Sequence, residues 1–175
     1  QAGIKKADRY DIAIIYTPDL CSAAGVFTSN KVKAAPVVLS KEHLQSGRGQ
    51  AVVVNSGCAN ACTGNKGYED AQAMARLAAE ALGCETENVF VASTGVIGTY
   101  LPMDKVSSGI IEAARNMSAE NGRLAARAIM TTDTVPKEIA VQTEINGILA
   151  TIGAMAKGSG MIHPNMATML GFITT

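Results

Sequence analysis

The stretch from Lys157 to Leu170, KGSGMIHPNMATML, leads through a glycine-rich loop to a small residue followed by threonine. A threonine hydroxyl is a poor nucleophile until a base activates it, and threonine enzymes commonly use their own α-amino group. That amine exists only if the chain is cut before Thr168. The Thr168 hydroxyl could make the cut by attacking the Ala167 carbonyl, because an N-to-O acyl shift gives an ester that water releases. The alternative is an ordinary strand threonine.

Two other segments gather hydroxyl groups. STGVIG at 93–98 follows an expected strand, where exposed N–H groups can bind a developing oxyanion. The Thr94 hydroxyl and the Gly95 amide are the candidates there, and a plain turn is the alternative. IMTTDT at 129–134 places three hydroxyls and a carboxylate after a helix. Such a cluster can bind the amino and carboxylate groups of an amino acid, or it can serve helix capping and turn formation.

The glycines of GSG at 158–160 do not form a nucleotide phosphate loop, because neither Lys-Ser, Lys-Thr nor a helix follows them. A flexible turn is the simpler interpretation of the glycines alone. Four cysteines, none in a CxxC pair, and two distant histidines give no metal site. Unpaired thiols in a reducing compartment favour the cytoplasm.

Composition limits the classes of partner. The 175 residues, 47% hydrophobic and 17% charged, fit a single domain over 1–175. Fifteen basic and fifteen acidic residues cancel, so a nucleic-acid footprint is not expected. The longest apolar runs, such as ILATIGAMA, are about half the length of a membrane span, so no membrane partner is expected either.

The elements that must position these residues are expected to alternate in type. Strands are predicted from β-branched and aromatic content at 10–17, 24–29, 35–40, 50–57 and 87–94. Polar residues every four positions predict a well-covered helix at 65–83 that ends at Gly83. Further helices are predicted from Pro102 to Met117 and at 119–130.

The C-terminal third is expected to form a hairpin. Asn146-Gly147 joins the predicted strands 137–145 and 148–157, and a last strand begins at 167–175. These elements together predict a layered α/β (α+β) protein with mixed or mainly antiparallel sheets whose outer faces are covered by helices. Because the last strand has no stop signal, we expect further polypeptide to complete the fold.

The segments ASTGVIG, AIMTTDTVPK and AKGSGMIHPNMATML together resemble the ornithine acetyltransferase family, the ArgJ-type glutamate N-acetyltransferases of arginine biosynthesis. NSGCANACTG at 55–64 is also similar to that family, whose more usual form carries Asn where Cys58 stands. This departure leaves the role of Cys58 open. The resemblance spans nearly the whole chain, and its PNMATML segment is specific.

The resemblance implies a precursor that cleaves itself at an Ala-Thr bond, here Ala167–Thr168. Residues 168–175 would then belong to the start of a beta chain. The implied fold is a sandwich like that of N-terminal-nucleophile enzymes, completed by the beta chain. The implied assembly is a heterotetramer of two alpha and two beta chains.

Site roles are likewise implied by the resemblance. The matching positions are Thr168 for the nucleophile, Thr94 and Gly95 for the oxyanion hole, and Thr131, Lys157 and Thr168 for substrate binding. Because Thr132 and Thr134 are so close in sequence, the match to Thr131 is open to an alignment slip. Further binding residues would come from the beta chain.

The implied reaction is ping-pong transfer of an acetyl group from N-acetylornithine to glutamate through an acetyl ester of Thr168. Lys157 would hold a substrate carboxylate as a point charge. The cycle needs no cofactor, and acetyl-CoA is a possible further donor.

Two other functions stay open. An N-terminal-nucleophile aminopeptidase or amidase would use the same threonine but let water reach the acyl-enzyme. A non-catalytic amino-acid-binding domain would need neither chain cleavage nor acetyl exchange.

Overall fold

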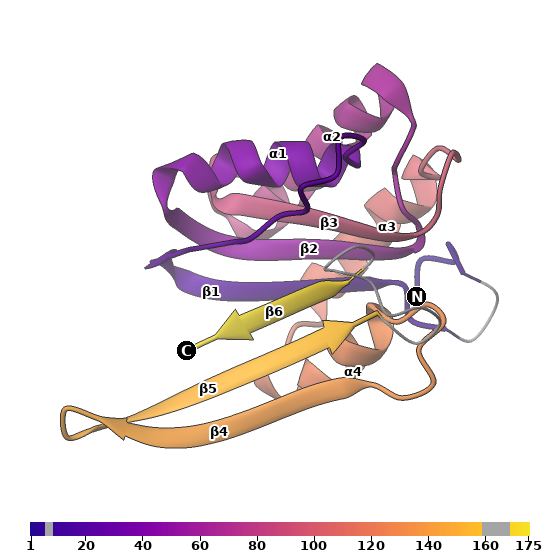
Figure 1. Ribbon diagram of the computed structural model, residues 1–175. Helices are drawn as coiled ribbons and strands as arrows, with labels where there is room; N and C mark the ends of the chain where they lie inside the picture. Colours follow the sequence, from indigo (N-terminus) through magenta and orange to yellow (C-terminus); the bar gives the residue numbers. More distant parts are fainter. Residues whose placement is uncertain (6–8, 159–168) are drawn as a thin grey trace.

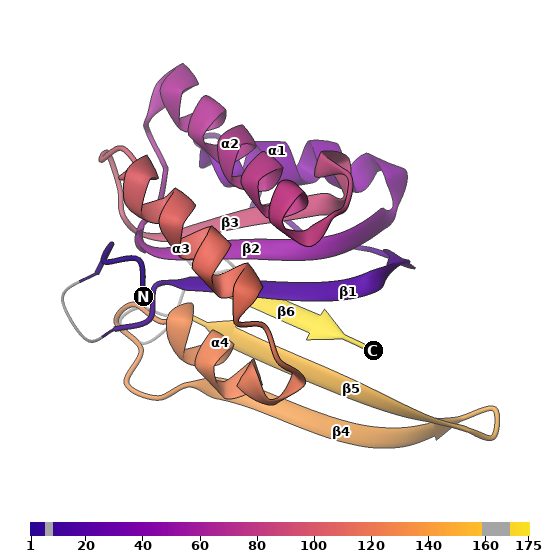
Figure 2. The ribbon, with the colours of Figure 1, turned by 180° about the vertical axis from the view of Figure 1, so that it is seen from behind.

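A computed structural model describes residues 1–5, 9–158 and 169–175 (Figure 1). It contains two three-stranded sheets, in the strand orders β1-β2-β3 and β4-β5-β6. Helices α1, α2 and α3 lie on one side of the first sheet, and the second sheet lies on its other side (Figures 1 and 2). The predicted mixed α/β class is confirmed.

The first sheet comprises β1 (Ile12–Ser22), β2 (Arg48–Cys58) and β3 (Val89–Val96). Strands β1 and β2 are antiparallel, whereas β2 and β3 are parallel. Successive residues of β2 are apolar because both faces of the sheet are covered. Val53 packs in the core beneath the helices, and Val54 packs in a second core on the opposite face.

Three helices form the outer layer of the first sheet, and a fourth packs in the second core. Their bounds are Ala35–His43 for α1, Gly64–Leu82 for α2, Met103–Arg115 for α3 and Gly122–Ala128 for α4, with 3-10 turns at Leu44–Ser46, Thr86–Asn88 and Ala119–Asn121. The predicted helix at 65–83 is confirmed as α2, which ends at the left-handed Gly83 (φ 72°). Within the described residues no helix is both long and apolar enough to cross a bilayer.

The second sheet is antiparallel throughout and comprises β4 (Lys137–Ile145), β5 (Ile148–Lys157) and β6 (Leu170–Thr174). The predicted hairpin is confirmed, with Ile145 paired to Ile148. Asn146 (φ 51°) and Gly147 (φ 79°) both adopt the left-handed conformation that a two-residue hairpin turn requires.

The two sheets meet through the second core. Met155 of β5 packs there with Val54 of β2 and Ile129, and Leu170 and Phe172 of β6 pack against this cluster. Helix α4 lies beside β1 and the β4–β5 hairpin (Figure 2). This packing brings the C-terminal end of β5 next to the C-terminal end of β3.

Two predicted strands are wrong. Residues 24–29 form no regular structure, and 35–40 form the first part of α1. The paired valines there favoured a strand, but Pro36 at the start of a helix is pre-organised for helical φ. Strand β1 also extends past the predicted end at residue 17 to Ser22, with a register shift between Tyr16 and Cys21.

Candidate active site

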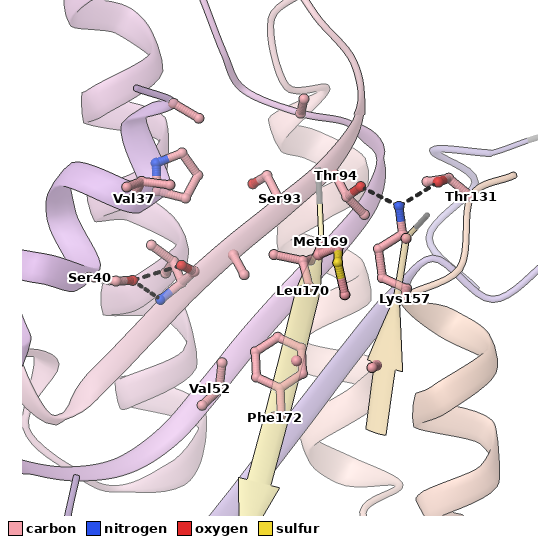
Figure 3. A pocket seen from close by; sticks show the side chains of 18 of the residues that line it. Val37, Ser40, Val52, Ser93, Thr94, Thr131, Lys157, Met169, Leu170 and Phe172 are labelled. Carbon is pink, nitrogen blue, oxygen red and sulfur yellow. Dashed lines mark hydrogen bonds between the residues drawn. The ribbon is translucent and has the colours of Figure 1, made fainter. Parts of the chain in front are cut away.

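Lys157, the last residue of β5, is the centre of the site. It is only 4% exposed, and its Nζ donates hydrogen bonds to Thr94 Oγ1 at 3.0 Å and Thr131 Oγ1 at 2.7 Å (Figure 3). An ammonium has three N–H donors. Among the described residues two of them therefore have hydrogen-bond acceptors. The structure brings together three predicted site residues from three distant segments.

Asp133 lies behind this lysine, with its nearer carboxylate oxygen 4.0 Å from Lys157 Nζ. It accepts hydrogen bonds from Lys137 Nζ (2.7 Å) and from the Gly158 N–H (2.8 Å), and a longer one from the Thr131 N–H (3.3 Å). Burial raises the pKa of the carboxyl, but these hydrogen bonds outweigh burial and lower the pKa to about 2. Asp133 is therefore an anion at neutral pH.

Burial lowers the pKa of Lys157 below its usual value, because the charged form loses hydration. The Asp133 carboxylate partly opposes this effect by raising the pKa, whereas the Lys137 charge lowers it further. The charge state of Lys157 thus depends on the balance between these two neighbours.

Lys5 adds another cation at the edge of the site. Its Nζ donates to the backbone carbonyls of Tyr10 (2.8 Å) and Ala128 (3.1 Å). Burial lowers its pKa to about 8, although the Asp11 carboxylate raises it in part. Lys157 lies near enough to lower the pKa of Lys5 as well.

The predicted oxyanion pair lies at the end of β3. Gly95 has φ 138°, and a Cβ added to it would come within 2.3 Å of the Gly57 backbone. Only glycine fits this position. Upstream on β3, Ser40 of α1 bonds both the N–H (2.8 Å) and the carbonyl (2.7 Å) of Val91.

The NSGCANACTG motif supports the loop after β3. Asn55, fully buried, donates to the Cys58 carbonyl at 2.9 Å and accepts from the Ser93 hydroxyl at 2.5 Å. The buried Cys58 thiol lies 3.2 Å from the Thr99 carbonyl. Cys58 is therefore a packing and hydrogen-bonding residue beneath the loop. Sequence reasoning missed this role because no local pattern links positions so far apart.

A cavity of about 1820 Å³ opens beside these residues (Figure 3). Lys157, Thr94 and Thr131 give it a polar end, while Val52 and Phe172 belong to its apolar walls. Such a cavity suits a ligand that is polar at one end.

Ala167 and Thr168, the predicted cleavage bond and nucleophile, lie outside the described residues. Their roles stay predictions, as do those of Thr94, Gly95, Thr131 and Lys157. The structure favours Thr131 over its neighbours, because the Thr131 hydroxyl accepts the bond from Lys157.

In the described part of the chain, no three His, Cys, Asp or Glu side chains are grouped closely enough to hold a metal ion. All four cysteines fall within the described ranges and carry free thiols.

Comparison with known proteins gives one consistent result. The family model described as "ArgJ family" matches residues 1–175. The arginine biosynthesis bifunctional protein ArgJ of Symbiobacterium thermophilum is 63% identical over 169 residues, which cover 97% of this chain and 42% of that protein. The protein of the same name from Caldanaerobacter subterraneus is 55% identical over 174 residues, covering 99% and 43%. The chain thus spans about two fifths of the length of these curated relatives.

Two solved structures share the fold. One is the arginine biosynthesis bifunctional protein ArgJ of Bacillus halodurans, with a TM-score of 0.87 and 44% identity, covering 97% of this chain and 87% of that one. The other is the ornithine acetyltransferase of Mycobacterium tuberculosis complexed with ornithine, with a TM-score of 0.83 and 45% identity, covering 93% and 87%.

Proposed function

This chain belongs to the ArgJ family, and we propose on that premise that it forms part of a glutamate N-acetyltransferase that takes its acetyl group from N-acetylornithine. The observation that carries the proposal is the convergence of Thr94 and Thr131 on the buried Lys157. A buried cation beside a cavity is suited to a substrate carboxylate. The bound ornithine of the Mycobacterium tuberculosis relative supports an amino-acid substrate.

In the first half-reaction the Thr168 hydroxyl attacks the acetyl carbonyl of N-acetylornithine, and its proton passes to the Thr168 α-amine. The C–N amide bond then breaks. Ornithine leaves as the amine after taking up that proton, and the acetyl group stays on Thr168 as an ester.

The transition state places negative charge on the acetyl oxygen. Thr94 Oγ1 accepts a hydrogen bond from Lys157, so the hydroxyl proton of Thr94 is available to donate to this oxygen. The positive charge of Lys157 polarises that hydroxyl, and the Gly95 N–H supplies a second donor.

In the second half-reaction the amine of glutamate attacks the ester carbonyl. The bond to Thr168 breaks, the hydroxyl regains its proton and N-acetylglutamate leaves. Lys157 binds the carboxylate of each substrate in turn, and the cycle needs no cofactor. Acetyl-CoA as a second acetyl donor for glutamate accords with the word bifunctional in the relatives' names.

The rest of the precursor is the proposed partner. Cleavage at Ala167–Thr168 would free the nucleophile's amine and leave an alpha chain bound to a beta chain, two of each forming a heterotetramer in the cytoplasm. The chain covers only 42% and 43% of the length of two relatives, which supports a further segment of the precursor as the partner.

Mass spectrometry of the full-length protein tests the proposal. We expect two fragments, the second beginning at Thr168, and one added acetyl mass on that fragment after incubation with N-acetylornithine. Glutamate should remove the mass and yield N-acetylglutamate in equal amount. Thr168→Ala should remain one chain and take up no acetyl group. Loss of the acetyl mass as free acetate at the same rate without glutamate would identify a hydrolase instead.

The oxyanion role has its own test. Thr94→Ala should slow acetyl transfer roughly a hundredfold to a thousandfold, the usual loss for one oxyanion donor. Ser108→Ala, which removes an exposed hydroxyl from α3, is the matched control and should transfer at the wild-type rate. A Thr94→Ala rate within about twofold of the wild-type rate would be far from the loss expected of an oxyanion donor and would exclude Thr94 from this role.

A further inference from the structure

Asp133 takes no part in the acetyl-transfer steps, yet among the described residues of the site it has the most polar partners. Its side chain is nearly inaccessible to solvent. It contacts the cation of β5, the first residue of β4, the backbone of its own loop and the backbone that follows β5. A buried carboxylate with so many partners costs desolvation energy, which a structural turn does not require.

The contacts of Asp133 all affect residues that surround the proposed substrate site. The carboxylate holds the N–H of Thr131, whose hydroxyl accepts from Lys157, and the N–H of Gly158, the residue after Lys157. At 4.0 Å it is too far from Lys157 Nζ for a hydrogen bond but near enough for strong charge attraction. It therefore attracts Lys157 by charge and accepts none of the N–H donors of this lysine.

Another buried aspartate, Asp70, has contacts that differ from those of Asp133. Asp70 of α2 also pairs with a lysine four residues away in sequence, Lys66, at 3.0 Å. That pair links two turns of one helix, and Asp70 does not line the cavity beside Lys157. Asp133 instead joins the 131–134 loop to β4 and β5.

We propose that Asp133 is a positioning residue that keeps Lys157 charged and directed toward the substrate carboxylate. The positive charge of Lys137 opposes the effect of Asp133 on Lys157. The inference rests on the proposed function, because it assigns Lys157 to a substrate carboxylate. Among the described residues, three cations lie around the Asp133 carboxylate: Lys137 at the start of β4, Lys157 at the end of β5, and Lys5 in the N-terminal segment.

Substitutions of Asp133 and of Lys137 should move the pH profile of kcat/KM in opposite directions. Substrate binding weakens when Lys157 loses its proton, so the basic limb of kcat/KM against pH reports Lys157. Asp133→Asn removes an attraction that raises the pKa of Lys157, so the basic limb should move to lower pH. Lys137→Met removes a repulsion that lowers this pKa, so the limb should move to higher pH.

The test uses the full-length protein after its two fragments have been verified. Asp133→Asn should lower kcat/KM for N-acetylornithine by about tenfold to a hundredfold, the range for a lost interaction with a charged group. Asp133→Glu keeps the charge and should restore the position of the basic limb. Asp70→Asn is the matched control and should keep the wild-type kcat/KM and pH profile.

Ornithine binding, measured by calorimetry across the same pH range, separates this inference from the proposed function. If the wild type binds ornithine but transfers no acetyl group, the proposed function fails and the binding profiles of the variants decide the role of Asp133. If Asp133→Asn does not fold, two other results decide the role of Asp133. The basic limb of Lys137→Met should move to higher pH, and the basic limb of Asp133→Glu should stay at the wild-type position. The inference is overturned if the basic limb moves in the same direction in Asp133→Asn and Lys137→Met, or if it moves in neither variant. A wild type that binds neither ornithine nor N-acetylornithine overturns both proposals.

Discussion

The two sheets of this molecule differ in how completely they are covered. Residues of β2 are buried on both faces, between the helical layer and the second core. Every residue of β4 is exposed. Both sheets are built from β-branched strands, so propensity does not explain the difference. In the first sheet, helices and the second core of this chain cover both faces. In the second sheet, the described residues leave one face exposed.

That bare surface is apolar. Opposed positions in the register place Ile139, Ala154 and Ile173 on one face, and the Ile145–Ile148 pair lies on the same face. Ile139 is 63% exposed and Ile173 is 76% exposed. Scattered apolar side chains are normal on a protein surface, but a contiguous apolar patch indicates an interface. On the proposed function, we therefore expect the beta chain to pack against this face of the second sheet.

The β3 edge of the first sheet is also covered, by helix α1. Strand β3 is an edge strand, and α1 satisfies its outward backbone groups through Ser40 at Val91 and through His43 at the Val89 carbonyl (2.8 Å). Covering an edge in this way prevents unwanted strand pairing. The site lies where this finished sheet meets the second sheet, with Thr94 from β3 and Lys157 from β5.

The largest expected effect tests the rigidity of the first sheet at the site. Gly95→Ala should lower the free energy of unfolding by more than about 4 kcal/mol, because both the positive φ and the contact with Gly57 exclude a Cβ. Urea unfolding of the full-length protein measures it. Gly122→Ala is the control, since that helical glycine has open space around it and should gain up to about 1 kcal/mol. Equal stability of the two variants would contradict the close approach.

The next effect tests the cover of the second sheet. Ile139→Asp should destabilise the full-length protein by about 3 kcal/mol or more, because its charge would be buried beneath the beta chain without a partner. Ile111→Asp on the outer side of α3 should change stability by less than about 1 kcal/mol. Urea unfolding and recovery of the two associated fragments are the measurements. A harmless Ile139→Asp would mean that the face of β4 remains in solvent.

The smallest effect tests the covered edge of β3. Ser40→Ala leaves the buried N–H and carbonyl of Val91 without their hydroxyl partner, so stability should fall by about 1 to 3 kcal/mol. Ser108→Ala, at an exposed position on α3, serves as the reference. Faster amide exchange at Val91 in Ser40→Ala would locate the loss at the edge. Unchanged exchange there would show that the hydroxyl does not protect β3.

Local sequence was sufficient where a local rule decides the structure. Asn146-Gly147 specified the hairpin because both residues must adopt positive φ, and the polar stripe of α2 specified a helix covered on most sides. It failed at 35–40, where the valine pair suggested a strand. There Leu39 packs into the helical core and Ser40 bonds to β3, so tertiary contacts outweigh the weak β propensity.

The sequence by itself indicated which residues are candidates for chemistry. The hydroxyl clusters pointed to Thr94 and Thr168 by residue type, and the resemblance to the family pointed to Thr131 and Lys157. Only the tertiary structure decided that Lys157 bonds to Thr94 and Thr131, that Asp133 stands behind it, and that Cys58 packs beneath the Thr99 loop. Hydrogen bonds and charge attraction act over a few ångströms in space, irrespective of separation along the chain. The packing of β5 against the first sheet brings these distant residues within that range.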